Sequence, residues 1–588
     1  MKIDYHNALN SEQLAACFYS GSVLLVSCPG SGKTRTLTYR IAHELEKIDR
    51  NKYVVAITYT NNAADEITER IEELGVDTTN LWIGTIHSFC LEWILKPYSV
   101  YIDELRYGYS IINPYDSEDI ITALCKDLKS PKINYYDCSY RFSQGEVYLQ
   151  CPDKLKHSNI KLVIDSYHKY LEVNNKIDFE LLLKYSASLI ETYPNIARNL
   201  SLLFKCILVD EYQDTRDVQY DILNRIFSSG EGKVTGFYVG DPNQSIFTSL
   251  GGGAIKHEDL CHQSGLSFEL LYLSTNYRSG SKIIDFFGGF KVFPSKLHPD
   301  SENLDKGFVS YNKSIHKSNL ATEISRIINY VVYEKKIKQN EICIICPQWI
   351  PLASMTRELS GLYPEFNFNG PGMSPFGRDV ENFWYKLCKL ALTQPSPDLY
   401  MKRRRWSRDV IVHLGRCGYV YANGVSNFLR LINSISINHD DGVKYLESYF
   451  SEFSSKMAGD ILSYTEIMDH YKSFFKSAND RIIKLKEKNI TGVDTISYFR
   501  KVFQSKDGIV ISTVHGAKGT EFDCIISYGL VEGMVPFFAD PDQTGSAKKT
   551  LYVIGSRARK YIFMISEIDS KRLPTKVLDG YIFSYDKF

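Results

Sequence analysis

Residues 22–34 read SVLLVSCPGSGKT, a short apolar run followed at once by a turn of small residues, a lysine and a threonine. The apolar run predicts a buried strand, and apolar residues recur at helical spacing over residues 37–45. In a strand–turn–helix segment of this kind, the backbone N–H groups bind phosphates. Lys33 would reach the β and γ phosphates, and Thr34 would ligate Mg²⁺. The strict pattern has glycine where this chain has Ser27. We expect a nucleotide-phosphate site here, with a plain glycine-rich turn as the alternative.

A second segment, residues 206–215, reads CILVDEYQDT and predicts a strand that ends in paired carboxylates. Asp210 at the strand tip suits a direct or indirect contact with Mg²⁺, and Glu211 is placed to orient or deprotonate an attacking water. An isolated Asp-Glu pair after a strand is usually a solvated turn. In a chain that also carries a phosphate loop, the pair instead predicts nucleotide hydrolysis.

Length, composition and charge bound the class of protein. A chain of 588 residues is too long for one hydrophobic core, so several domains are expected, and 44% apolar with 23% charged residues excludes a disordered or collagen-like chain. The opening MKIDYHNALN lacks a signal pattern and no apolar run approaches ~18 residues, so we expect a cytoplasmic protein without a membrane partner. With 69 basic and 69 acidic residues, contacts to nucleic-acid phosphates must be local.

The 13 cysteines do not form a disulfide framework, because the count is odd and no export signal precedes them. Cys343 and Cys346 form the one close pair, in the apolar run EICIICP. No second pair lies nearby to complete a four-ligand metal site. We therefore expect a buried strand there, with metal binding as the alternative.

Apolar runs and amphipathic helices alternate along the chain, which predicts parallel sheets with helices on both faces and the α/β class. The predicted strands of a first sheet are residues 22–27, 54–60, 206–209, 234–239 and 270–273, and those of a second begin near Ile342 and continue at 508–514, 524–530 and 561–566. The Tyr-rich stretch 90–200 and the charge-rich stretch 396–506 look helical. Each sheet domain is therefore expected to carry a mostly helical insertion.

Nine motifs stand in a fixed order and identify a family. The chain resembles the superfamily 1 helicases of the UvrD, Rep and PcrA type from residue 9 to about residue 567, apart from the two insertions. The motifs are LNSEQ (9–13), SCPGSGKT (27–34), TYTNNAADEI (58–67), GTIHSF (84–89), VDEYQDT (209–215), VGDPNQSIF (239–247), NYRS (276–279), TVHGAKGTEFD (513–523) and YVIGSRAR (552–559).

The resemblance implies two RecA-like P-loop NTPase domains with parallel sheets, each interrupted by a mostly helical insertion. The first motor domain would comprise residues 1–90 and 200–279 with insertion 91–199, and the second residues 280–395 and 507–588 with insertion 396–506. ATP with Mg²⁺ would lie between the sheets, so that closure and opening become a motor stroke. The implied activity is ATP-dependent translocation on single-stranded DNA and unwinding at single-strand/duplex junctions, with 3′ to 5′ polarity.

The resemblance also assigns roles to single residues. Gln13 would pair with adenine, Tyr277 would stack on the base, Gln244 would sense the γ phosphate, and Arg278 and Arg557 would neutralise charge on the transferred phosphoryl group. The implied catalytic set is Lys33, Glu211, Gln244, Arg278 and Arg557. The implied nucleotide-binding set is Gln13, Pro29, Gly30, Ser31, Gly32, Lys33, Thr34, Arg35, Tyr277, Arg278, Glu521 and Arg557, with Thr34 and Asp210 on the metal. The implied DNA contacts are Tyr59, Asn61, Thr85, His87, Phe247 and His515, where aromatic stacking accepts any base.

Some positions depart from the family pattern. Ser249 and Leu250 stand where relatives carry a Trp and an Arg that grip DNA, and Ser546 and Ala547 replace an acidic pair. These changes leave the implied ATP-binding residues intact and affect the implied DNA contacts. We therefore expect the affinity for DNA to fall steeply with salt, and Ser249→Trp to tighten the binding of single-stranded DNA. The basic run KRRRWSR, residues 402–408, would either touch duplex DNA or form a solvated helix face.

Two other functions fit parts of the pattern. One is a DNA-dependent ATPase that senses or translocates on DNA without unwinding, and the other is an ATP-operated switch that gates a partner nuclease. No acidic and lysine cluster of a nuclease follows the last motif, so the chain is expected to cleave no DNA itself and to work with a separate nuclease subunit. The resemblance extends to the UvrD-like helicases of bacterial anti-phage systems such as Gabija, with a stand-alone repair helicase as the alternative.

Overall fold

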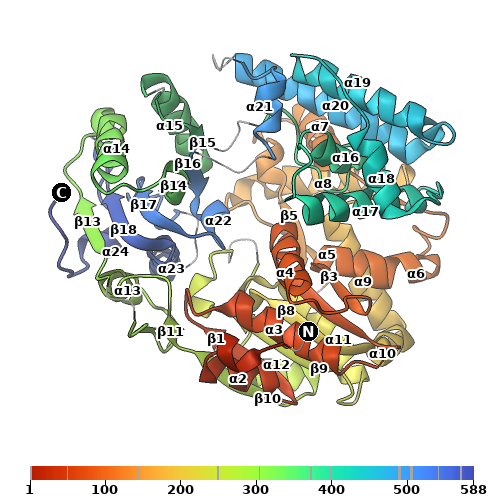
Figure 1. Ribbon diagram of the computed structural model, residues 1–588, viewed down its shortest axis with the longest axis horizontal. Coiled ribbons are helices and arrows are strands. Elements are labelled where there is room, and N and C mark those ends of the chain that lie inside the picture. The colour runs from red at the N-terminus through yellow and green to blue at the C-terminus, as the bar shows by residue number, and fades with distance from the viewer. Residues whose placement is uncertain are drawn as a thin grey trace. The chain divides into compact units, whose positions relative to one another are not determined.

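The computed structural model divides the chain into two compact units (Figure 1). The first comprises Met1–Ile112, Ile120–Gln348 and Ser512–Phe588, and the second comprises Asn113–Asp119 and Trp349–Ile511. The structure describes residues 3–49, 51–143, 145–247, 251–302, 305–363, 365–370, 374–397, 399–487, 492–503, 508–538, 540, 542–569 and 572–588.

The first unit contains a six-stranded sheet in the order β10-β1-β9-β8-β2-β3, with every pairing parallel. All five strands predicted for it are confirmed. The predicted strand 54–60 ends earlier than expected, because Thr60 accepts a hydrogen bond from the Ala63 N–H and so begins the next helix. The strand after that helix was missed because its side chains are only partly buried. The strands are β1 (Ser22–Ser27), β2 (Tyr53–Thr58), β3 (Leu81–Thr85), β8 (Phe204–Asp210), β9 (Thr235–Gly240) and β10 (Phe268–Leu273).

Helices cover both faces of this sheet, as predicted. Alternate residues of each strand point to opposite faces, so Val23 and Leu25 of β1 pack with α3 (Lys33–Glu46) and α4 (Asn61–Glu73). Leu24 belongs to the core on the other face, which includes α11 (Asp217–Ser229). Because both faces of the sheet are buried, successive residues of each strand are apolar, and the strands appear in the sequence as continuous apolar runs.

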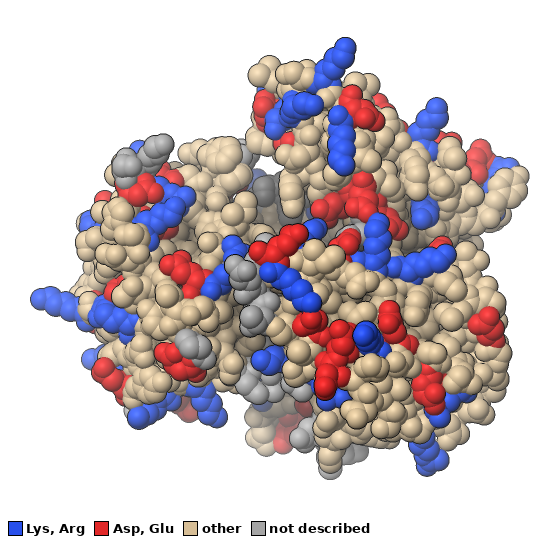
Figure 2. Space-filling view, turned by 90° about the horizontal axis from the view of Figure 1, so that it is seen from above, with Lys and Arg blue, Asp and Glu red and all other residues tan. Residues whose placement is uncertain are grey.

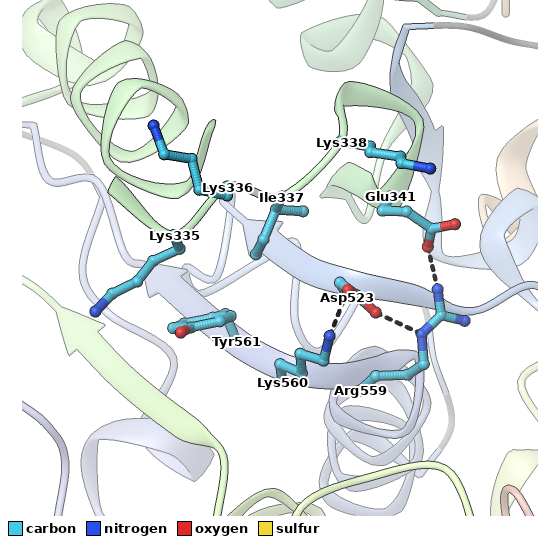
Figure 3. Close-up of a pocket in the computed structure, with 9 residues that line it drawn as sticks. All are labelled: Lys335, Lys336, Ile337, Lys338, Glu341, Asp523, Arg559, Lys560 and Tyr561. Atoms are coloured by element: carbon cyan, nitrogen blue, oxygen red, sulfur yellow. Dashed lines mark hydrogen bonds and ion pairs between the residues drawn. The ribbon is translucent and has the colours of Figure 1, made fainter. Parts of the chain in front are cut away.

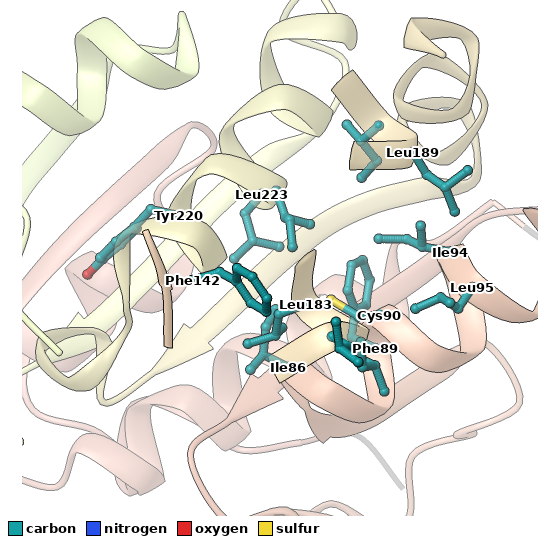
Figure 4. Close-up of a cluster of buried hydrophobic side chains, with 14 of the residues drawn as sticks. Ile86, Phe89, Cys90, Ile94, Leu95, Phe142, Leu183, Leu189, Tyr220 and Leu223 are labelled. Carbon is teal, nitrogen blue, oxygen red and sulfur yellow. The ribbon is translucent and has the colours of Figure 1, made fainter. Parts of the chain in front are cut away.

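The segment between β3 and β8 is mostly helical, as predicted, but it also contains a short antiparallel hairpin of β5 (Tyr140–Ser143) and β6 (Glu146–Leu149). Its residues share one core with the sheet domain. Figure 4 shows Phe142 and Leu183 of this segment near Leu223 of α11. The main helices here are α8 (His157–Val173), α9 (Phe179–Thr192) and α10 (Pro194–Leu203).

A second parallel sheet follows in the first unit, in the order β13-β18-β17-β14. Its first strand was missed in the sequence. Cys343 and Cys346 are fully buried in β14, so the predicted core strand is confirmed there. The strands are β13 (Phe308–Asn312), β14 (Ile342–Cys346), β17 (Phe522–Ser527) and β18 (Ala558–Ile565); helix α13 (Ser281–Gly288) precedes β13 in the chain, and α23 (Gln543–Ser556) lies between β17 and β18.

The second unit is mostly helical and has its own aromatic-rich core. It also holds the parallel pair of β15 (Phe368–Asn369) and β16 (Ile509–Thr513), of which β16 continues into the first unit. The helical interpretation of residues 396–506 is confirmed. The main helices are α16 (Phe383–Ala391), α17 (Tyr400–Arg416), α18 (Gly424–Asn433), α19 (Gly442–Lys456), α20 (Thr465–Lys486) and α21 (Ile496–Arg500).

The basic run 402–408 differs from both predictions at one position. Arg403 is only 2% exposed, and its guanidinium donates to the carbonyl oxygens of Leu390 and Thr393 and to Asn433. It is neither a solvated charge nor available to DNA. The helical period turns this one arginine of the run inward, where it ties α17 to its neighbours.

Charge is mixed over the surface. Figure 2 shows basic and acidic side chains interspersed over the face in view, in keeping with a formal net charge of zero. Among the described residues, no helix combines the length and the apolar character needed to cross a membrane.

Candidate active site

The phosphate loop lies between β1 and α3, where two glycines adopt left-handed backbone conformations. Gly30 has φ +67°, and a Cβ there would lie 2.6 Å from the Arg278 Cβ. Gly32 has φ +80°, and a Cβ there would lie 2.6 Å from the Gln13 Nε2. Both conformation and space therefore require glycine. The unusual Ser27 is buried and donates to the Gly240 carbonyl oxygen at 2.9 Å, which accounts for a side chain at this position.

The remaining loop residues are held from both sides. Ser31 donates to the Cys28 carbonyl oxygen at 2.7 Å, and Asn276 donates to the carbonyl oxygen of the buried Pro29 at 2.6 Å. Thr34 lies in the first turn of α3 and is partly exposed, and the next residue, Arg35, is exposed. The loop is thus held by hydrogen bonds within the protein.

Lys33 and Glu211 form an ion pair across the site. Their Nζ and Oε1 atoms are 2.6 Å apart, and the side chains are 15% and 19% exposed. Glu211 has φ +51°, an uncommon backbone conformation for a residue other than glycine, directly after the end of β8. Because β8, β9 and β1 are neighbours in a parallel sheet, their carboxyl ends bring Asp210, Glu211 and the phosphate loop to one edge.

The charged groups at this edge of the sheet shift one another's pKa values. Burial would lower the pKa of Lys33, but the carboxylates of Glu211 and Asp210 outweigh it and raise that pKa. Burial raises the pKa of Asp210, and the charge of Glu211 adds to the effect. Burial would also raise the pKa of Glu211, but Lys33 and then Lys518 hold it below its ordinary value. Glu211 is therefore ionised at neutral pH.

A hydrogen-bond relay joins this edge to the segment after β9. The Gln213 amide donates to Glu211 at 2.5 Å and accepts from the Asp241 N–H at 3.0 Å. Gln244 donates from Nε2 to Asp241 at 2.8 Å and accepts on Oε1 from Arg557 Nη2, also at 2.8 Å. The predicted catalytic residues Glu211, Gln244 and Arg557 thus belong to one connected network.

The two predicted arginines differ in environment. Arg557 is 3% exposed, and burial followed by the charge of Arg278 lowers its pKa to about 9. Arg278 donates to Glu521 at 2.5 Å and to the Ser556 carbonyl oxygen at 2.8 Å. Both guanidinium groups therefore lie at the end of α23.

The residues predicted for the base are engaged within the protein. Gln13 accepts from the Asn10 N–H at 3.0 Å and donates to the Ser31 carbonyl oxygen at 3.0 Å, so its amide is tied to the phosphate loop. The Tyr277 ring is 44% exposed, and its hydroxyl accepts from Asn10 at 2.6 Å. Tyr277 presents a ring for stacking, whereas Gln13 would have to exchange a partner to meet adenine.

Three of the predicted DNA residues form a cluster of rings. The Phe247 centroid is 4.9 Å from that of Tyr59 and 4.9 Å from that of His515. The ammonium of Lys518 lies 5.3 Å from the Phe247 centroid and donates to the Gln244 carbonyl oxygen at 2.6 Å and to Asp214. Lys518 therefore connects the ring cluster to the hydrogen-bond network that contains Gln244.

The other predicted DNA residues lie at helix starts. Asn61 is exposed at the first position of α4, and Thr85 accepts from the Ser88 N–H and so begins α5 (Ile86–Phe89). His87 lies in α5, and burial lowers its pKa to about 4, so it is neutral at physiological pH. Ser249 and Leu250 lie outside the described residues. Of the other departures, Ser546 donates to Asp540 and Ala547 is buried.

A pocket of about 380 Å³ lies at the amino ends of β17 and β18 (Figure 3). Arg559 in its wall pairs with Glu341 and Asp523 and also, at 3.1 Å, with Glu521. Figure 3 shows Lys335 directed away from Asp523 and Arg559. The pocket is thus linked through Glu521 to Arg278, and the charge of Arg559 is neutralised by carboxylates.

A cluster in the second unit has metal-ligand residue types. Ligand atoms of His413, Cys417 and Glu466 lie within 4.8 Å of one another. However, the Lys386 ammonium lies 3.1 Å from the His413 Nδ1, while the Nε2 lies 3.1 Å from Glu466. A metal-bound imidazole carries a proton on its other nitrogen, which an ammonium group cannot accept. Hydrogen bonding therefore accounts for this cluster.

Sequence reasoning missed several residues of the network: Gln213, Asp214, Asp241, Lys518 and Tyr552. All five lie inside the motifs that were recognised, so position in a motif was the available signal. Their partners could not be identified, because the Tyr552 contact with Asp241 joins residues 311 apart in the chain and the Lys518 contact with Asp214 joins residues 304 apart.

Comparison with known proteins gives consistent matches. Residues 9–254 match the family model described as UvrD/REP helicase N-terminal domain, and residues 440–568 match the one described as UvrD-like helicase C-terminal domain. A protein named probable DNA helicase II homolog from Rickettsia conorii is 26% identical over 98% of this chain and 97% of its own length. ATP-dependent DNA helicase PcrA from Bacillus subtilis is 24% identical over 94% of this chain and 82% of its own length. PcrA from Staphylococcus aureus strain Mu50 is 33% identical, over 54% of this chain and 44% of its own length.

Proposed function

Because the chain belongs to the UvrD/Rep/PcrA-type family of superfamily 1 DNA helicases, we propose that it is an ATP-driven motor that moves along single-stranded DNA and unwinds duplex at junctions. The observation that carries the proposal is the network joining Lys33 and Glu211 of the first sheet domain to Arg557 of the second. A site built from two sheet domains can convert nucleotide state into domain movement.

The residues present fit ATP and Mg²⁺. The left-handed Gly30 and Gly32 form the tight turn in which backbone N–H groups can hold phosphate, and the Thr34 hydroxyl and Asp210 carboxylate are the oxygen ligands that Mg²⁺ prefers. When bound, Mg²⁺ would neutralise charge on the phosphates. Lys33 would turn from Glu211 to the phosphates, leaving the Glu211 carboxylate free to accept a proton from the attacking water.

DNA would bind at the rings of Tyr59, Phe247 and His515. Each ring has a face on which any base can stack, which suits binding without sequence preference. Lys518 contacts both Phe247 and Gln244, so DNA bound at the rings would affect the ATP site. We extend the proposal to 3′ to 5′ polarity, to the division into two motor domains with two insertions, and to action beside a separate nuclease in phage defence. Family resemblance supports these extensions.

Two variants test the ATP site. Lys33→Ala removes the cation that would face the phosphates, so ATP binding and DNA-stimulated hydrolysis should both be lost. Glu211→Gln keeps the pocket and removes the carboxylate, so hydrolysis should fall at least 100-fold while ATP is retained. The measurements are steady-state phosphate release with single-stranded DNA and titration with a fluorescent ATP analogue. Near wild-type turnover in either variant would refute the site.

A further inference from the structure

The hydroxyl of Tyr552 makes a buried contact that the proposed chemistry has not used. Tyr552 lies on α23 and is fully buried, and its hydroxyl donates to the Asp241 Oδ2 at 3.1 Å. Asp241 is also fully buried, directly after β9. Tyr552 thus fixes one oxygen of a carboxylate that water does not reach.

The same Asp241 oxygen orients Gln244. It accepts from the Gln244 Nε2, whereas the Gln244 Oε1 accepts from Arg557. An arginine can only donate, so the Gln244 Oε1 must face Arg557 and the Gln244 Nε2 is left to donate to Asp241. The orientation of Gln244 therefore depends on where Asp241 is held.

Helix α23 reaches the 241–244 turn at two points. Tyr552 acts on it through Asp241, and Arg557, at the carboxyl end of the same helix, acts on it through Gln244. A movement of α23 would therefore shift both ends of the turn together.

We propose that Tyr552 is a positioning residue for ATP hydrolysis, whose hydroxyl holds Asp241 and, through Asp241, the Gln244 amide in its hydrolysis-competent orientation. This rests on the proposed function, because it assumes that Gln244 faces the γ phosphate during turnover. Among the described residues, the Tyr552 hydroxyl hydrogen-bonds to Asp241 and makes no hydrogen bond to the phosphate loop, so its loss should change turnover rather than ATP binding.

The test is Tyr552→Phe, which removes one oxygen and keeps the ring. The kcat of DNA-stimulated ATP hydrolysis should fall about tenfold while the KM for ATP stays within twofold. Tyr238→Phe is the matched control: Tyr238 lies on β9, is fully buried, and among the described residues its hydroxyl has no hydrogen-bond partner. Its kcat and KM should equal those of the wild type.

A double-mutant cycle separates positioning from a general loss of stability. Asp241→Asn alone should lower kcat, and adding Tyr552→Phe should lower it no further, because both act through one carboxylate. The inference would be overturned if kcat were unchanged in Tyr552→Phe, if only KM changed, or if the two losses of kcat multiplied in the double mutant. Each of these results would leave the proposed function standing. A wild-type protein that hydrolyses no ATP would refute both. If Tyr552→Phe does not fold, Asp241→Asn still decides, since an unchanged kcat there overturns the inference.

Discussion

Lys33 forms an ion pair with Glu211, so under the proposed function ATP would compete with a carboxylate for Lys33. Glu211→Gln removes the charge that holds Lys33. A partly exposed ion pair contributes on the order of 1 kcal/mol, so ATP should bind this variant about fivefold more tightly than it binds the wild type. Calorimetric titration with a non-hydrolysable ATP analogue measures the difference.

A matched control removes a comparable carboxylate elsewhere. Glu180 pairs with Arg216 at 2.9 Å, and the two side chains are 22% and 15% exposed. Glu180→Gln should leave the affinity for ATP unchanged, because this pair does not involve the phosphate loop. Equal or weaker ATP binding in Glu211→Gln would show that Lys33 is not restrained by Glu211 in solution.

At the scale of the elements, the segment after β9 carries both a predicted catalytic residue and a predicted DNA contact, since Phe247 follows the turn that contains Gln244. Phe247→Ala should weaken binding of a single-stranded oligonucleotide about tenfold, because one stacked base contributes roughly 1–3 kcal/mol. Fluorescence anisotropy with labelled oligothymidylate measures the loss. Tyr193→Ala is the control, since Tyr193 belongs to an exposed ring pair with Tyr101. Equal affinities of wild type and Phe247→Ala would place DNA elsewhere.

The elements also show what could be predicted and why. The strand, turn and helix of residues 22–46 follow from local patterns, because apolar runs, glycine positions and helical spacing are all read over a few neighbours. The strand β13 lacked such a pattern, because only two of its five residues are buried. The inward turn of Arg403 could not be told from its basic neighbours, since burial depends on the helices packed against α17.

The candidate site could likewise be predicted only where local sequence patterns were informative. Residue types within motifs identified Lys33, Glu211 and Arg557 as members of a nucleotide site, and the structure places them in one network. Partners such as Asp241 for Tyr552 depend on how two sheet domains meet, which no local pattern records.

At the scale of the whole molecule, zero net charge and mixed surface charge give DNA no general attraction to this protein. The proposed function therefore assigns DNA recognition to the ring cluster and nearby polar groups. Lys518 contacts both Phe247 of that cluster and Gln244 of the catalytic network. The account consequently predicts that DNA at the rings changes the rate at the ATP site.

The most direct measurement is the steady-state rate of ATP hydrolysis by the wild-type protein with Mg²⁺, in the absence of DNA, with single-stranded oligothymidylate and with blunt duplex. The account predicts that single-stranded DNA raises kcat at least tenfold and that blunt duplex does so much less. A rate that is the same with and without single-stranded DNA, or the absence of hydrolysis under all three conditions, would contradict an ATP-driven DNA motor.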